Sequence, residues 1–100
     1  MADRGDKIEI ENFTSPGRTY RVDRAKYEAM AAALLAVLPA GAPGLTVAEA
    51  KARVLLRLPA DRFPGGEKAG WWLKAAQLDL EAKGAIRREA TKPLRLHRTT

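Results

Sequence analysis

The chain contains no cysteine and has few of the other residues that carry chemistry. Without cysteine it has no disulfide, no thiolate metal site and no cysteine nucleophile. A single histidine, His97, and a single serine, Ser15, leave little for acid–base or nucleophilic catalysis. The longest apolar run, residues 29–40, includes Pro39 and is too short to cross a bilayer. Composition therefore argues against most enzyme classes and against a membrane span.

The 100 residues suffice for one small domain with a single core. Six aromatic residues stand beside 19 alanines, a balance that favours helices over a β-sandwich. The first seven residues mix both charges and lead into no apolar segment, so they do not resemble a signal peptide. We therefore expect a cytoplasmic protein with no membrane contact.

The net charge of +6 is unevenly distributed. Residues 85–100 carry five basic side chains against Glu89 alone, a net charge of +4, whereas residues 1–84 carry 13 basic and 11 acidic side chains. Basic clusters attract phosphate backbones and anionic surfaces, although they also serve only to keep a protein soluble. Charge alone does not decide between these uses.

Residues 1–22 are predicted to form an extended arm. Ile8 and Ile10 alternate with charged residues, and Tyr20 and Val22 do so again after a Pro16–Gly17 turn. The pattern leaves open whether the two extended pieces pair with each other or dock separately on the core.

Three helices are predicted to follow, at 24–38, 47–58 and 67–83. Asp23 can cap the first, Thr46 and Glu49 form a capping box for the second, and Gly84 can close the third with a left-handed backbone. Phe63, in the preceding loop, is expected to plug the core. The predicted core comprises Tyr27, Met30, Leu34, Leu38, Val54, Leu55, Trp72, Leu73, Leu80, Ile86 and Leu96.

A two-stranded hairpin is predicted at 85–89 and 94–98, with Ile86, Leu94 and Leu96 turned inward. Leu45–Thr46 is placed to add a short third strand. The order of helices and strands predicts an α+β fold, a three-helix winged helix-turn-helix over 23–100 with a C-terminal β-hairpin wing and the N-terminal extended arm.

Residues 80–88 carry the pattern Leu-Glu-x-x-Gly-x-Ile-x-Arg. This pattern resembles the end of the third helix and the first wing strand in many bacterial winged-helix regulators. Three further segments, 16–23, 63–66 and 70–84, resemble a family of small bacterial proteins of unknown function. The resemblance implies the fold and a bacterial, DNA-binding type of protein; it implies no activity.

Catalytic groups are not placed to cooperate. His97 lies between basic residues without a second metal ligand, and we expect it to be a solvent-exposed strand residue. Asp79 and Glu81 point in different directions from one helix, so they are not a glycosidase pair. Residues 65–68 lack the spacing of a phosphate loop. We expect no enzyme activity, no catalytic residue, no cofactor and no metal site.

Trp71 and Trp72 differ by about 100° in direction on a helix, so both rings cannot enter one core. We assign Trp72 to the core and favour Trp71 as a seal at the core's edge, under the wing or the arm. The alternative leaves Trp71 exposed as a contact for a base, a sugar or a protein.

The outer face of the third helix is poor in base-reading groups, because Trp71, Ala75 and Leu78 lie there with only Lys74. Asp79 and Glu81 nearby would repel phosphates, and Gln77 lies off-centre. One hypothesis is therefore a nucleic-acid binder, for duplex DNA above all, that relies on its wing. The alternative is a protein-interaction module or homodimer that uses Trp71, Ala75 and Leu78. The nucleic-acid hypothesis assigns binding to Lys68, Trp71, Lys74, Arg87, Arg88, Lys92, Arg95 and Arg98.

Overall fold

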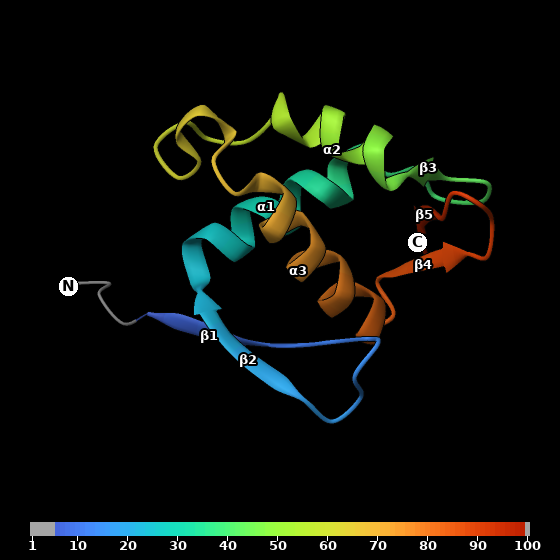
Figure 1. The fold of residues 1–100 in the computed structure, drawn as a ribbon, viewed down its shortest axis with the longest axis horizontal. Helices are drawn as coiled ribbons and strands as arrows, with labels where there is room; N and C mark the ends of the chain where they lie inside the picture. The colour runs from blue at the N-terminus through green and yellow to red at the C-terminus, as the bar shows by residue number, and fades with distance from the viewer. Residues whose placement is uncertain (1–5, 100) are drawn as a thin grey trace.

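The computed structural model describes residues 6–99, and within them the chain forms three α-helices and two small antiparallel sheets (Figure 1). The first five residues of the predicted arm and Thr100 of the predicted domain lie outside the described residues. The elements in chain order are β1 (Lys7–Glu11), β2 (Thr19–Asp23), α1 (Arg24–Val37), β3 (Leu45–Thr46), α2 (Val47–Leu55), the 3₁₀ turn η1 (Pro64–Gly66), α3 (Ala69–Ala82), β4 (Ile86–Glu89) and β5 (Arg95–Arg98).

The carboxy-terminal sheet has the strand order β3–β5–β4, and the central β5 is antiparallel to both neighbours. The short strand at Leu45 pairs with Leu96, as the sequence predicted for a third strand. The predicted α+β class is confirmed. The order of elements from α1 to β5, together with this strand order, is compatible with a winged helix in which β4 and β5 form the wing.

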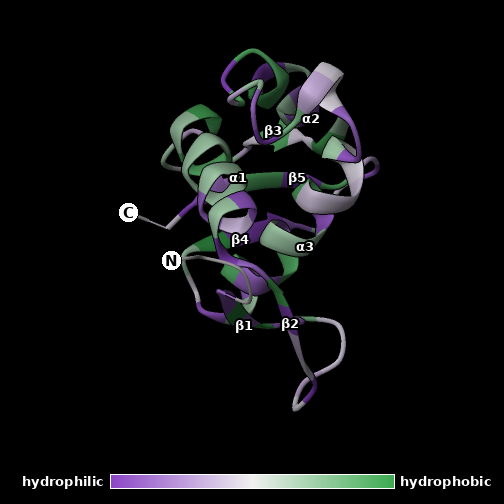
Figure 2. Cartoon of the chain, turned by 90° about the vertical axis from the view of Figure 1, so that its left-hand side faces the viewer, coloured by the Kyte–Doolittle hydropathy of each residue, from purple (hydrophilic) through white to green (hydrophobic). Residues whose placement is uncertain are grey.

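The two strands of the arm pair with each other, which answers the question that the sequence left open. β1 and β2 form a five-residue antiparallel ladder in which Ile10 lies opposite Tyr20. The hairpin runs beside α3 at the lower edge of Figure 1, and its turn projects away from the helices in Figure 2. The backbone N–H of Phe13 donates to the carbonyl oxygen of Leu78 at 3.2 Å, which joins the hairpin to α3.

The predicted caps of the first two helices are confirmed. The Asp23 carboxylate accepts from the Lys26 amide at 3.1 Å at the start of α1. At the start of α2, the Glu49 amide donates to the Thr46 hydroxyl at 3.1 Å, and the Glu49 carboxylate accepts from the Thr46 amide at 2.9 Å. These bonds satisfy amides that have no partner within the helix.

The ends of α3 follow from two backbone conformations. Lys68, with a φ of 59°, is the left-handed residue from which the helix starts, two residues later than predicted. Gly84 has a φ of 80° and closes the helix, as predicted. The Ala85 amide donates to the carbonyl of Leu80, and the Gly84 amide donates to that of Glu81, so the stop is a Schellman motif that leads directly into β4.

The predicted core is confirmed except for Leu55. Leu55 is 41% exposed, because α2 ends at this residue and its side chain lies against Gly66 in the following loop. Val54, one position earlier on the helix, is fully buried. Phe63 is buried as predicted, and its ring meets that of Trp72 edge to face at 6.4 Å. The confirmed members are Tyr27, Met30, Leu34, Leu38, Val54, Trp72, Leu73, Leu80, Ile86 and Leu96.

Within residues 6–99, no helix is long and apolar enough to cross a membrane.

Candidate functional site

Arg88 is held within the protein and is not a free cation of the wing. Its guanidinium forms two bonds to the buried carboxylate of Glu81, Nε to Oε1 at 2.5 Å and Nη2 to Oε2 at 2.8 Å. Its other side lies over the ring of Phe13, 4.9 Å from the centroid. A bidentate pair with a buried partner fixes the guanidinium. Arg88 therefore joins the wing to α3 and to the arm.

Arg95 and Arg98 also hold the wing to the body. Arg95 Nη1 donates to the Gly44 carbonyl at 3.0 Å and lies 3.7 Å from the Glu49 carboxylate. Arg98 Nε donates to the Leu38 carbonyl at 2.9 Å. Arg87 and Lys92 differ, because both are exposed and neither forms an ion pair within the described residues. Of the five basic side chains predicted on the wing, Arg87 and Lys92 therefore present the most available charge.

His97 is buried, so the prediction of a solvent-exposed strand residue was wrong. Its Nε2 lies 2.7 Å from a carboxylate oxygen of Glu89, and its Nδ1 lies 2.9 Å from the Arg98 carbonyl. These contacts to groups of the hairpin give both ring nitrogens a partner, as a buried imidazole requires. The Arg98 carbonyl, together with the Glu89 carboxylate, raises the pKa of the imidazole above its usual value, because both favour the doubly protonated ring.

Asp79 and Glu81 are buried, which corrects the expectation that they would repel phosphates at the surface. The Asp79 carboxylate accepts from the Glu11 amide and from Lys83 Nζ, each at 2.9 Å, and from the Tyr27 hydroxyl. Burial, reinforced by Asp79, raises the pKa of the Tyr27 phenol, so the hydroxyl keeps its proton. Glu81 is neutralised by its arginine partner on the wing.

Gln77 is fully buried beside these carboxylates, and its amide nitrogen donates to Glu81 at 3.0 Å. The sequence had placed Gln77 off-centre on the outer face. Residues 76–81 of α3 are instead all buried, by the core, the arm and the wing, whereas Ala82 at the end of the helix is exposed.

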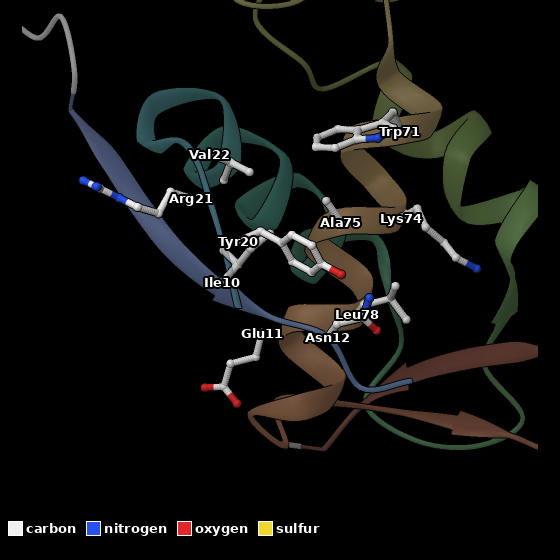
Figure 3. Close-up of a pocket in the computed structure, with 10 residues that line it drawn as sticks. All are labelled: Ile10, Glu11, Asn12, Tyr20, Arg21, Val22, Trp71, Lys74, Ala75 and Leu78. Atoms are coloured by element: carbon white, nitrogen blue, oxygen red, sulfur yellow. The ribbon is translucent and has the colours of Figure 1, made fainter. Parts of the chain in front are cut away.

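The amino-terminal half of α3 is open. Lys68, Trp71 and Lys74 are exposed there, and Figure 3 shows the Lys74 side chain directed away from the arm. Lys51 of α2 reaches the same region, since its Nζ lies 3.3 Å from where a Cβ on Gly70 would be. Small Gly70 thus leaves room for a cation from the neighbouring helix.

Trp71 is 58% exposed, so its favoured assignment as a seal of the core was wrong. Trp72 fills the core position, and the two rings meet edge to face with their centroids 5.0 Å apart. The arm reaches α3 farther along the helix, at Leu78, and does not cover the Trp71 ring. The exposure of the ring agrees with the alternative assignment, and a role for Trp71 as a contact residue stays a prediction.

A groove lies between the arm and α3 (Figure 3). Its volume is about 400 Å³. All three residues proposed as a protein interface line this groove, but their exposure differs, because Trp71 is exposed, Ala75 is half-buried and Leu78 is buried. The remaining lining residues are Lys74 and residues of the arm, from its two strands and from Asn12 directly after β1. In the part of the chain that the structure describes, no cluster of three metal-ligating side chains is present.

These features define a small α+β protein with a basic surface on α2, α3 and the wing, and with an aromatic groove beside it. The chain belongs to DUF6958, a family of unknown function, whose family model matches residues 7–96. Searches of curated proteins and of solved structures gave no match to the chain. The family match spans both strands of the arm, all three helices and most of the wing.

Proposed function

We propose that this chain is a cytoplasmic winged-helix protein that binds duplex nucleic acid, DNA above all, mainly through phosphate contacts. The observation that carries the proposal is the separation of charges around α3. Its two carboxylates are buried and paired, whereas Lys68 and Lys74 are exposed. Within α3 itself, from Ala69 to Ala82, the exposed charge that can reach a phosphate is therefore positive, although exposed Glu67 adjoins Lys68 just before the helix.

Neighbouring elements extend the basic surface. Lys51 of α2 lies against Gly70, and the wing that follows α3 carries Arg87 and Lys92. Arg88, Arg95 and Arg98 take structural roles first, because their guanidinium groups already bind groups of the protein. We therefore assign phosphate binding chiefly to the exposed lysines and to Arg87.

Sequence preference is expected to be modest. Of the side chains that most often read base edges in the major groove, the exposed start of α3 offers only lysine and has no asparagine, glutamine or arginine. Phosphate contacts position a protein on a duplex but give no sequence specificity. Affinity should consequently vary little among unrelated duplexes.

The test is fluorescence anisotropy with labelled duplexes of unrelated sequence. A triple variant, Lys74→Ala, Arg87→Ala and Lys92→Ala, should bind all of them more weakly to a similar degree. The matched control removes three exposed arginines elsewhere, Arg18→Ala, Arg57→Ala and Arg62→Ala, and so makes the same change in net charge. Equal losses in both variants would mean that net charge alone is responsible, and the proposal would fail.

The alternative, a protein interface on the outer face of α3, is favoured by the 58% exposure of Trp71. Its third member, Leu78, is buried, which reduces the apolar area that a partner helix or a second copy could cover. Sedimentation velocity distinguishes the two proposals. Self-association that is lost in Trp71→Ala, without any binding of nucleic acid, would favour the interface.

A further inference from the structure

The groove beside α3 has an apolar floor built from alternating positions of the arm. Ile10 lies opposite Tyr20, and Val22 is two residues farther along β2, so their side chains share one face of the hairpin. Ile10 and Val22 are buried, whereas Tyr20 remains 42% exposed above them. Tyr20 is thus the member of this face that its neighbours leave uncovered.

The opposite wall comes from α3. Trp71, Ala75 and Leu78 follow at spacings of four and three residues, which places them on one face of the helix. Tyr20 on the arm and Trp71 on α3 therefore stand on opposite sides of a groove of about 400 Å³ (Figure 3). Both side chains are partly open to solvent, at 42% and 58% exposed. Two exposed aromatic side chains across an apolar floor provide surfaces on which a flat ring can stack.

Hydrogen-bonding groups lie at one end of the groove. The Tyr20 hydroxyl points toward α3 in Figure 3, near Asn12 and Leu78. Asn12 Oδ1 accepts from the Thr14 amide at 2.8 Å and from the Thr14 hydroxyl at 2.7 Å. Because its oxygen is thereby occupied, Asn12 offers its amide nitrogen as a donor. The flat ring that fits here has hydrogen-bond acceptors on its edge.

Cations stand on both sides of the groove and point outward. In Figure 3, Arg21 extends from β2 on one side, Lys74 extends from α3 on the other, and the Glu11 carboxylate also turns away. A ligand whose ring enters the groove and whose charge stays outside would meet these cations. Aromatic surfaces between flanking cations are the arrangement that binds single-stranded nucleic acid, whose bases stack while its phosphates follow the rim.

We propose that the groove receives one unpaired nucleobase, which stacks on Trp71 and Tyr20 while the adjoining phosphates pass Lys74 or Arg21. This site rests on the proposed function and refines it, because a fully paired duplex cannot place a base in the groove without unpairing it. The preferred ligand is then a nucleic acid with unpaired bases, such as a single strand or a duplex with an overhang.

The experiment compares a labelled oligothymidylate with a fully paired, blunt duplex by fluorescence anisotropy. Wild-type protein should bind the oligothymidylate at least as tightly as the duplex. Trp71→Ala should weaken binding of the oligothymidylate about 5- to 150-fold, the range measured for loss of one stacked base, and should leave duplex binding nearly unchanged. Trp71→Phe should restore most of the affinity, since it keeps an aromatic face.

Further variants and a second readout separate stacking from general surface effects. Tyr20→Ala should weaken binding and Tyr20→Phe should do so less, because the latter loses only the hydroxyl. Leu56→Ala removes an 88% exposed apolar side chain outside the groove and should change nothing. Stacking should also quench the fluorescence of wild-type protein, and the quenching should be much smaller in Trp71→Phe. Circular dichroism verifies the fold of each variant.

The outcomes distinguish this site from the proposed function. If the groove variants bind oligothymidylate like wild type while the triple cation variant loses duplex affinity, the base site is wrong and the proposed function stands. If no nucleic acid binds at low salt, both are wrong. If Trp71→Ala abolishes self-association instead and leaves oligothymidylate binding intact, the groove is a protein-docking surface and the base site is overturned.

Discussion

Replacing Asp79 tests the junction between the arm and α3 most severely. Asp79→Ala deprives the Glu11 amide and the Tyr27 hydroxyl of their acceptor. The buried Tyr27 hydroxyl left without a partner costs about 1–3 kcal/mol, and the Glu11 amide costs less, because its residue is exposed and water can replace the carboxylate. Lys83 contributes little beyond this, because its side chain is 43% exposed and remains hydrated after the change. The free energy of unfolding should therefore fall by about 1.5–4 kcal/mol, a large fraction of the stability of a small domain.

Urea unfolding followed by circular dichroism measures this loss. Tyr27→Phe removes one donor and leaves Asp79 with the other two, so it should cost about 1 kcal/mol. Lys83→Ala is the exposed control and should cost less than about 1 kcal/mol. Hydrogen exchange adds a local readout, since the Glu11 amide should lose protection in Asp79→Ala before the core does. An Asp79→Ala variant within about 1 kcal/mol of wild type would refute this account of the junction.

Three further predictions concern the wing and its attachment. Arg88→Ala leaves the buried Glu81 carboxylate without its arginine partner and should lower the free energy of unfolding in urea by about 2–4 kcal/mol. This is less than the usual cost of breaking a buried ion pair, because the arginine is 30% exposed. An unchanged free energy of unfolding would mean that Arg88 does not hold the wing to α3. The pKa of His97 is higher in the folded than in the unfolded protein, so protonated His97 stabilises the fold. This contribution to the free energy of unfolding is fully present below the unfolded pKa of about 6.5 and is lost as the pH rises through the folded pKa. The advantage of wild type over His97→Gln in urea midpoint should shrink as the pH rises above about 6.5, and a difference that stays constant with pH would contradict this. Gly44→Ala should unfold at a lower temperature than Gly84→Ala. Both glycines have a positive φ, but a Cβ on Gly44 would lie 2.2 Å from the Leu96 carbonyl oxygen, whereas a Cβ on Gly84 would meet nothing within 4 Å. Equal melting temperatures would argue against the close approach of Gly44 to Leu96.

Local signals predicted much of the fold. Asp23, the Thr46–Glu49 box and Gly84 each act through hydrogen bonds or backbone angles within a few residues, so the sequence alone places these helix ends well. The inward positions of Ile86, Leu94 and Leu96 likewise predict the wing, because a buried face of a strand recurs every two residues. The same pattern does not predict that His97, next to Leu96 on β5, is buried as well. The end of α2 was less predictable, because the helix was expected to reach residue 58 and ends at Leu55. Where it ends depends on how the following loop accommodates the backbone groups of the last turn, which have no partner within the helix.

The candidate site was harder to predict, because its pairs join residues distant in the chain. The Glu11 amide and the Asp79 carboxylate are 68 residues apart, and no local pattern links them. One signal was available in Gln77-Leu78-Asp79-Leu80-Glu81, where leucines occupy two faces of the same helix turn. A helix with two apolar faces needs two coverings, and polar residues between them become buried. The arm covers the second apolar face of α3 at Leu78, but it does not cover Trp71.

The salt dependence of duplex binding tests the central claim, that exposed cations of α3 and the wing hold phosphates. Plotted against log salt concentration, log affinity for a random duplex should fall linearly, because each neutralised phosphate releases counterions. The variant with Lys74, Arg87 and Lys92 replaced by Ala should flatten this slope by about 2.7, or about 0.9 for each of three contacts, and the Arg18, Arg57 and Arg62 control should keep the wild-type slope. A triple variant with the wild-type slope, or a wild-type protein that binds no duplex at low salt, would contradict the account.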